Sequence, residues 1–165
     1  MTFVLAAVVH ATIADIQNPP VTRCPGLDNP VVDVLAINVT GAKLGEEIAI
    51  DGAVHVKEVV GQHPVLQLSF AKPDGEKLPC DPRVMPCQLN LCNGTTEQEK
   101  ELSKDWHNTC PVQPGMYSTH LPFLLPEGQD AKNYFGDGNV VVTFKIVNGS
   151  EVLGCVFIPV AIDVD

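Results

Sequence analysis

Residues 140–162 read "VVVTFKIVNGSEVLGCVFIPVAI", and this stretch decides the fold of the chain. On both sides of Asn148-Gly149, apolar residues occupy every second position, which is the period of a β-strand with one buried face. They are Val140, Val142, Phe144 and Ile146 before the pair, and Val156, Ile158, Val160 and Ile162 after it. Asn-Gly favours a two-residue hairpin turn, because both central positions need a positive φ. The stretch therefore predicts an antiparallel hairpin with one apolar face.

The same alternation recurs in residues 46–59, "EEIAIDGAVHVKEV", and in residues 65–70, "VLQLSF". Further strands are expected at residues 31–39 and 115–126. Short alternating strands separated by turn signals are typical of an antiparallel sandwich. The predicted fold class is all-β: an immunoglobulin-like antiparallel β-sandwich of two sheets. The Cys…Trp…Cys pattern of true immunoglobulin domains is absent from the sequence.

Residues 95–108, "TTEQEKELSKDWHN", are the one helical candidate. Thr96 followed by Glu99 has the spacing of a capping box, and Leu102 and Trp106 are spaced to share one helix face. We expect one short helix here, inside a loop bounded by Cys92 and Cys110. The alternative is a solvated surface turn, because isolated helices this short are marginally stable.

The chain has six cysteines, three of them in "CDPRVMPCQLNLC", residues 80–92. A zinc site could use Cys87, Cys92, His107 and Cys110, but their spacing fits zinc pairs only loosely. A redox centre would favour C-x-x-C, which the sequence lacks. In an oxidising compartment, six cysteines indicate three disulfides, and spacing alone leaves fifteen connectivities. Disulfides are the interpretation that we favour, with no metal and no cofactor.

The N-terminus and the asparagine sequons indicate secretion. Residues 3–9 are an apolar run followed by small residues, which predicts a signal peptide over residues 1–14; an N-terminal strand is the alternative. N-glycosylation sequons begin at Asn38, Asn93 and Asn148. We expect a glycosylated protein that is secreted or resides in the endolysosomal lumen.

Composition and motifs exclude several classes of function. A chain of 165 residues most simply forms one domain, and its net charge of -10 argues against nucleic acid, which requires clustered Lys and Arg. The sequence contains no G-x-S-x-G, no H-E-x-x-H and no P-loop, and its histidines are scattered. We therefore expect a binding protein and not an enzyme.

Four segments together are similar to the ML-domain lipid-recognition family. In order they are Cys24, "LPCDPRVMPCQLNLC" (residues 78–92), "TCPVQPGMYS" (residues 109–118) and "VLGCVFIPVAI" (residues 152–162). The cysteine core resembles the ganglioside-activator branch, and the last strand is similar to the Niemann-Pick type C sterol carriers. The resemblance implies the disulfides Cys24–Cys155, Cys80–Cys87 and Cys92–Cys110, and one ML-type lipid-binding domain over residues 24–165.

The resemblance also implies a function. Members of this family hold lipid between their sheets, so we expect an apolar cavity that holds one sterol, fatty acid or glycolipid for transfer or presentation. A sterol-specific transport protein is the narrower alternative. The residues alone favour a solid core, because protein interiors close to high density. A solid-core sandwich for extracellular adhesion or innate-immune recognition is the alternative from another class.

The predicted lipid contacts are the inward residues of the strands. They are Val54, Val56, Leu66, Leu68, Phe70, Tyr117, Leu121, Phe123, Val142, Phe144, Ile146, Val156 and Ile158. Leu102 and Trp106 are predicted to contact the membrane during loading, because tryptophan suits an interface. The expected partners are a lipid ligand, a transient membrane surface and a protein acceptor or receptor.

Overall fold

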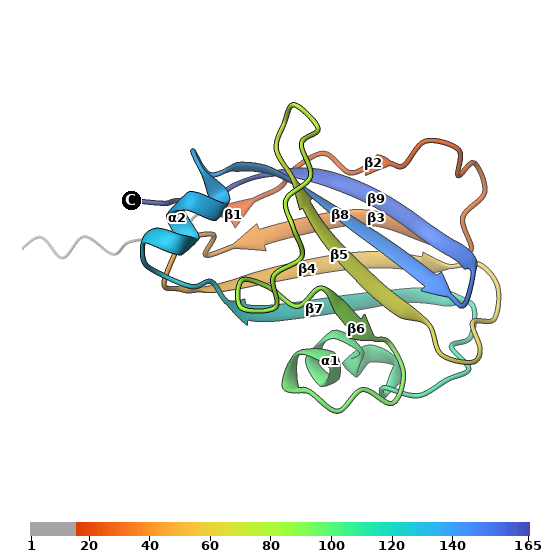
Figure 1. The fold of residues 1–165 in the computed structure, drawn as a ribbon. Helices are drawn as coiled ribbons and strands as arrows, with labels where there is room; N and C mark the ends of the chain where they lie inside the picture. Colours follow the sequence, from red (N-terminus) through yellow and green to blue (C-terminus); the bar gives the residue numbers. More distant parts are fainter. Residues whose placement is uncertain (1–15) are drawn as a thin grey trace, which may run out of the picture.

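The computed structural model describes residues 16–165, and the predicted signal peptide at residues 1–14 lies outside them. Two antiparallel sheets pack face to face (Figure 1). The four-stranded sheet has the order β1 (Ile16–Gln17), β3 (Val32–Thr40), β4 (Glu47–Val56) and β7 (Gly115–Leu124). The five-stranded sheet has the order β2 (Thr22–Arg23), β9 (Glu151–Ala161), β8 (Asn139–Asn148), β5 (Val65–Ala71) and β6 (Gln88–Asn90). The predicted all-β sandwich is confirmed.

Alternation sets which side chains of the four-stranded sheet enter the core. On β4, the buried residues are Ile48, Ile50, Val54 and Val56, all on the face that the sequence pattern predicted. The next strand, β7, pairs with β4 along its whole length, from Glu47 opposite Leu124 to Val56 opposite Gly115. A bulge between Val34 and Ala36 interrupts the β3–β4 register, so the buried positions of β3 shift from Val32 to Ile37 and Val39.

The β8–β9 hairpin forms as predicted, but its turn lies one residue further along the chain. Asn148 is still paired, opposite Glu151, and of the two predicted turn residues only Gly149 has a positive φ, 62°. Asn148 stays in the strand because its side-chain amide donates a hydrogen bond of 2.7 Å to the carbonyl oxygen of Gly61. The predicted Asn148-Gly149 turn is therefore wrong in register, and residues 149–150 connect the strands.

Disulfides join Cys24 to Cys155, Cys80 to Cys87, and Cys92 to Cys110, as the family resemblance implies. The first bond ties the chain next to β2 onto β9. The second closes a loop before β6, and the third closes the segment that carries the predicted helix. Because Cys87, Cys92 and Cys110 are all oxidised, the zinc interpretation is wrong.

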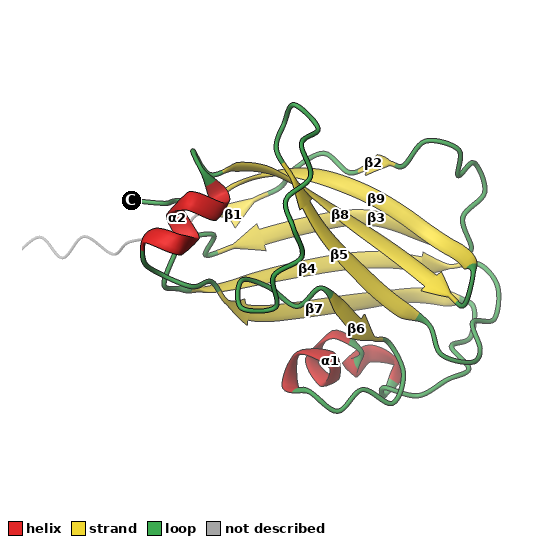
Figure 2. Cartoon of the chain, in the orientation of Figure 1, coloured by secondary structure: helices red, strands yellow, loops and turns green. Residues whose placement is uncertain are grey.

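Within residues 16–165, two short α-helices lie against the sandwich (Figure 2). The predicted one is α1 (Glu97–Leu102), and a 3-10 turn at Lys104–Trp106 follows it. The second, α2 (Gln129–Phe135), was not expected, because Gly128 at its N-cap provides no side-chain cap for a sequence pattern to reveal. Neither helix approaches the length of a membrane span, and no helix in residues 16–165 is long and apolar enough for one.

The sandwich has two unlike ends, which we name for what fills them. At the α2 end, Phe70 packs edge-on against Tyr134 and Phe135, with ring centroids 6.5 and 5.7 Å apart. Phe135 is only 2% exposed. At the other end, which we call the cavity end, lies the β8–β9 turn (Figure 1). The segment between Cys92 and Cys110, which we call the insert, lies along the side of the sandwich, against β6 and β7.

Candidate functional site

A cavity of about 90 Å³ lies between the two sheets at the cavity end. Both sheets contribute walls, and most of their lining side chains are aliphatic. From the four-stranded sheet these residues are Val32, Val34, Ile37, Ile50, Gly52, Val54, Val56, Thr119 and Leu121. From the five-stranded sheet they are Leu66, Phe144 and Ile146. Such a surface favours an apolar ligand, because each buried methylene contributes about 0.8 kcal/mol.

The insert and the neighbouring loops form the remaining wall. Leu102 and Trp106 of the insert line the cavity together with Val60, Pro64, Leu91 and Val112. Leu102 is 4% exposed, and Trp106 is half-buried. The two side chains share a face, as expected, but this face points into the sandwich. Their predicted contact with a membrane stays a prediction, and in this conformation both side chains line the cavity.

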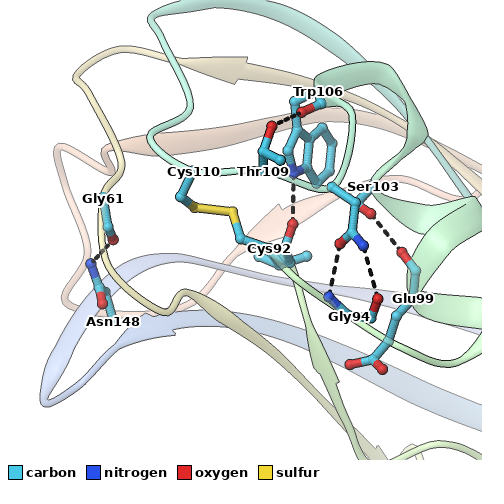
Figure 3. The surroundings of a disulfide bond; sticks show 11 residues. Gly61, Cys92, Gly94, Glu99, Ser103, Trp106, Thr109, Cys110 and Asn148 are labelled. Carbon is cyan, nitrogen blue, oxygen red and sulfur yellow. Dashed lines mark hydrogen bonds between the residues drawn. A yellow bond between two sulfur atoms is a disulfide. The ribbon is translucent and has the colours of Figure 1, made fainter.

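Trp106 is fixed by contacts on two sides, of which Figure 3 shows the hydrogen bond of the indole nitrogen. Its indole N–H donates a hydrogen bond of 2.7 Å to the carbonyl oxygen of Leu91. Its ring meets the ring of Tyr117 edge-on, with centroids 5.9 Å apart. Next to it, the Asp105 carboxylate accepts a 2.8 Å hydrogen bond from the Ser118 amide on the outer edge of β7. These contacts seat the insert over the gap between β6 and β7.

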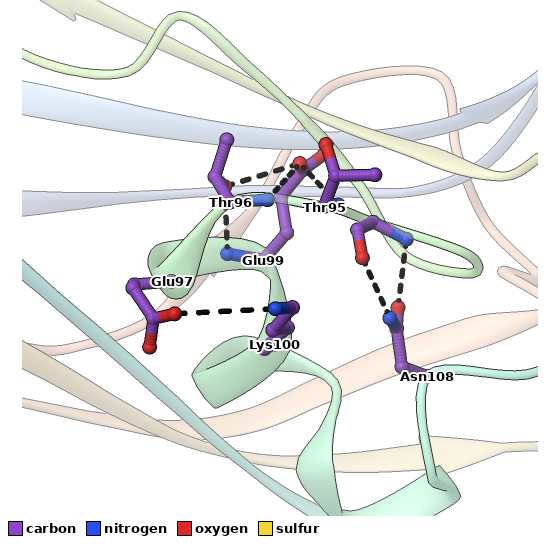
Figure 4. A network of polar contacts seen from close by, with 7 residues as sticks. Thr95, Thr96, Glu97, Glu99, Lys100 and Asn108 are labelled. Carbon is purple, nitrogen blue, oxygen red and sulfur yellow. Dashed lines mark hydrogen bonds and ion pairs between the residues drawn. The ribbon is translucent and has the colours of Figure 1, made fainter.

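Glu99 holds the insert together from within (Figure 4). The carboxylate is buried, and it accepts hydrogen bonds from the backbone amides of Asn90, Thr95 and Thr96 and from the Thr96 hydroxyl. The Thr96 hydroxyl also accepts from the Glu99 amide, which completes the predicted capping box. Burial of Glu99 raises its pKa, but these hydrogen bonds outweigh burial and leave the pKa below its ordinary value. A charged carboxylate thus ties α1 to β6.

Backbone and amide hydrogen bonds close the cavity end. Val60 and Val112 exchange two backbone hydrogen bonds, of 3.0 and 2.7 Å, and both side chains line the cavity. The Asn148 amide holds Gly61 next to them (Figure 3). The loop after β4, the segment that follows the insert and the β8–β9 hairpin therefore meet at one point.

The three sequons differ in how accessible their asparagines are. Asn38 is exposed on the outer face of β3, and Asn93 is exposed in the insert with φ of 57°. Asn148 is only half-buried, but its amide nitrogen is the atom that donates to Gly61. Glycosylation remains a prediction at all three positions, and Asn38 and Asn93 are the freer acceptors.

The structure places six of the thirteen predicted lipid contacts in the cavity wall. These are Val54, Val56, Leu66, Leu121, Phe144 and Ile146. Six others are buried in the packed core away from the lining: Leu68, Phe70, Phe123, Val142, Val156 and Ile158. The prediction treated every inward residue alike, whereas this cavity lies at one end of the sandwich.

Tyr117 is the thirteenth predicted contact, and it does not line the cavity. Its hydroxyl donates a hydrogen bond of 2.7 Å to the carbonyl oxygen of Gln113. Its ring packs edge-on against the ring of Trp106. Tyr117 is thus a structural tyrosine in this conformation, with its hydroxyl already engaged.

Several lining residues were not predicted. Val32, Val34 and Ile37 lie on β3, whose bulge breaks the alternation that would have identified them. Leu91, Val60, Pro64 and Val112 lie outside the strands or at loop ends, where periodicity gives no signal. Gly52 could have been noticed, since it interrupts a run of inward β-branched residues on β4.

The fold has a counterpart among solved structures. A Niemann-Pick type C2 protein from Japanese carpenter ant matches with a TM-score of 0.51 and 11% sequence identity, over 94% of this chain and 96% of that chain. The two proteins share a fold. The C-terminal domain of wzt matches with a TM-score of 0.44 and 12% identity, over 87% of this chain and 77% of that chain. No protein-family model and no curated protein sequence matches this sequence.

Proposed function

We propose that this protein binds one lipid in the cavity between its sheets and carries or presents it without chemical change. The observation that carries the proposal is the cavity itself, whose walls are almost wholly aliphatic and aromatic. The ML-like fold supports it, as do the family features of the sequence. A protein of this kind works in the extracellular space or the endolysosomal lumen, where its three disulfides are stable.

Loading a lipid requires the cavity to widen. Its 90 Å³ is less than the roughly 150 Å³ of an engineered cavity that binds benzene, and a lipid chain is much larger than benzene. The insert is the wall that moves in our proposal. Glu99 and the Cys92–Cys110 disulfide hold it as a unit. Glu99 and Trp106 also join it to Asn90 of β6 and to Leu91, whereas one hydrogen bond, from the Ser118 amide to Asp105, joins it to β7 of the other sheet.

A solid-core recognition sandwich is the second candidate. The packed α2 end and the small volume of the cavity favour this second candidate. A space of 90 Å³ is compatible with a sandwich that never opens to a ligand. The two candidates differ in one measurable respect. Only the lipid carrier takes up an added lipid into its cavity.

Native mass spectrometry after incubation with a total lipid extract tests the proposal. We expect the folded wild-type protein to carry one lipid equivalent, which organic extraction recovers. In Val54→Phe, a phenyl ring enters the cavity and should displace the lipid. His55→Phe adds the same ring at the neighbouring, oppositely directed position of β4 and should bind as the wild type does.

A folded wild-type protein that takes up no lipid would overturn the proposal in favour of the solid-core alternative. Equal occupancy in Val54→Phe and the wild type would also overturn it, because the ligand would then lie elsewhere. Thermal unfolding of each variant shows that it is folded. Val56→Phe, at the next inward position, replaces Val54→Phe if the latter does not fold.

A further inference from the structure

Thr119 carries a polar group that the cavity leaves available. Among the described residues that line the cavity, the other side chain with a polar atom is Trp106, and its N–H is bonded to Leu91. Within residues 16–165 the Thr119 hydroxyl makes no hydrogen bond to the protein, although the residue is half-buried. A hydroxyl can both donate and accept, so it can meet either kind of ligand group.

The absence of a side chain at Gly52 leaves the space that the Thr119 hydroxyl occupies. Gly52 lies opposite Thr119 in the β4–β7 pairing, and it is the one inward position of β4 without a side chain. A β-carbon at residue 52 would lie 2.5 Å from the Thr119 oxygen. The hydroxyl therefore rests over bare backbone, on the inner face of the sheet. The missing side chain also leaves space for a ligand next to it.

We infer that Thr119, placed over Gly52, is the polar anchor of the cavity and hydrogen-bonds the single uncharged polar group of an otherwise apolar ligand. This inference rests on the proposed function, since it names the ligand class for the same site. No Lys, Arg or His is among the described lining residues. A charged headgroup at Thr119 would be buried without an opposite charge, which is costly. The geometry thus selects alcohols, ketones or esters over carboxylates and phosphates at this depth.

Displacement of N-phenyl-1-naphthylamine by matched ligands tests the inference. Decan-1-ol and undecane have the same chain of heavy atoms, with a hydroxyl in one and a methyl group in the other. We expect the wild type to bind the alcohol about three- to tenfold more tightly than undecane, after correction for the ligands' solubility in water. Decanoic acid at pH 7 should bind more weakly than the alcohol, because its charge has no partner in the cavity.

Two variants separate the hydroxyl from the shape of the site. Thr119→Val keeps the branched shape and removes the oxygen, so its preference for the alcohol should disappear while undecane binds as before. Thr119→Ser keeps the oxygen and should retain the preference. Gly52→Ala pushes a methyl group against the hydroxyl and should reduce the preference. Thermal unfolding and circular dichroism establish that each variant is folded.

The outcomes distinguish the inference from the proposed function. If the wild type binds neither ligand nor the fluorescent probe, the proposed function fails and the inference with it. If the ligands bind, but Thr119→Val prefers the alcohol as strongly as the wild type does, the inference alone is wrong. Binding with a lost preference in Thr119→Val and a retained one in Thr119→Ser supports both.

Discussion

The α2 end and the cavity end of the sandwich are built by the same strands, yet aromatic rings fill the first and an apolar space remains in the second. At the α2 end, α2 places Phe135 and Tyr134 against Phe70, and the three rings interlock. At the cavity end, β4 contributes valines and Gly52, and the insert covers the opening. Strand alternation thus decides which side chains point inward, whereas their volume and their cover decide whether the interior is filled.

The segments that close the two ends are held by different interactions. Apolar packing around Phe135 holds α2 in place. Hydrogen bonds to the ionised Glu99 and a disulfide hold the insert in place. Apolar packing around Phe135 contributes directly to the free energy of unfolding of the whole domain. The hydrogen bonds of Glu99 and the disulfide instead hold the insert in one internal conformation. The predictions below test this difference.

Phe135→Ala should produce the largest loss of stability. The side chain is 2% exposed and sits between Phe70 and Tyr134, so its removal leaves a cavity in a well-packed region. We expect the free energy of unfolding to fall by about 3–5 kcal/mol, measured by urea denaturation. Ligand binding to the remaining folded protein should be unchanged. A loss below about 1 kcal/mol would show that the α2 end is not the packed half of the molecule.

Glu99→Gln should have an intermediate effect that depends on pH. Removal of the charge weakens hydrogen bonds to a buried carboxylate, at a cost of about 1.5–3 kcal/mol at neutral pH. Because the folded-state pKa of Glu99 is lowered, its stabilising contribution is present above the unfolded pKa of about 4.3 and is lost as pH falls through the folded value.

The stability difference between the wild type and Glu99→Gln should therefore stay constant from pH 8 to 5 and shrink below pH 4.5. Denaturation curves at five or six pH values measure it. Glu97→Gln, at an exposed position of the same helix, is the matched control and should show no such profile. A difference that grows on acidification would contradict the sign of the Glu99 pKa shift.

A matched pair of valines gives the smallest and most specific effect. Val142→Ala removes two methyl groups from the packed core, and Val54→Ala removes the same groups from the cavity wall. Val54 already lacks neighbours on its cavity side, so we expect a loss of about 1 kcal/mol there and about 2 kcal/mol for Val142→Ala. Equal losses, measured under identical denaturation conditions, would mean that the two ends are packed alike.

The fold was largely predictable because period-two alternation is a local property of each strand. Residues 46–59, 65–70 and 140–162 gave the buried faces of β4, β5 and the β8–β9 hairpin directly. The exact turn was not predictable, because the Asn148 amide is held by Gly61, which is distant in sequence. The helix α2 was missed because a glycine N-cap gives no capping signal.

The candidate site was less predictable, because a cavity forms where the side chains of distant segments leave space between them, and sequence patterns do not report that space. The sequence showed that Leu102 and Trp106 share a face, but it could not show whether that face meets a membrane or the protein's own interior. The pairing of Gly52 with Thr119 depends on the register between β4 and β7, which alternation alone does not specify. Without that register, thirteen inward residues had to be treated as equivalent.

Methyl-resolved NMR tests the central claim, that only the cavity end admits a ligand, most directly. The protein is labelled with ¹³C at Ile, Leu and Val methyl groups and titrated with decan-1-ol. We predict saturable shift changes and contacts from the ligand to the methyl groups of Ile50, Val54 and Leu66, with none at Val142 and Ile158. Saturable contacts at Val142 or Ile158, or no saturable shift anywhere, would contradict the account.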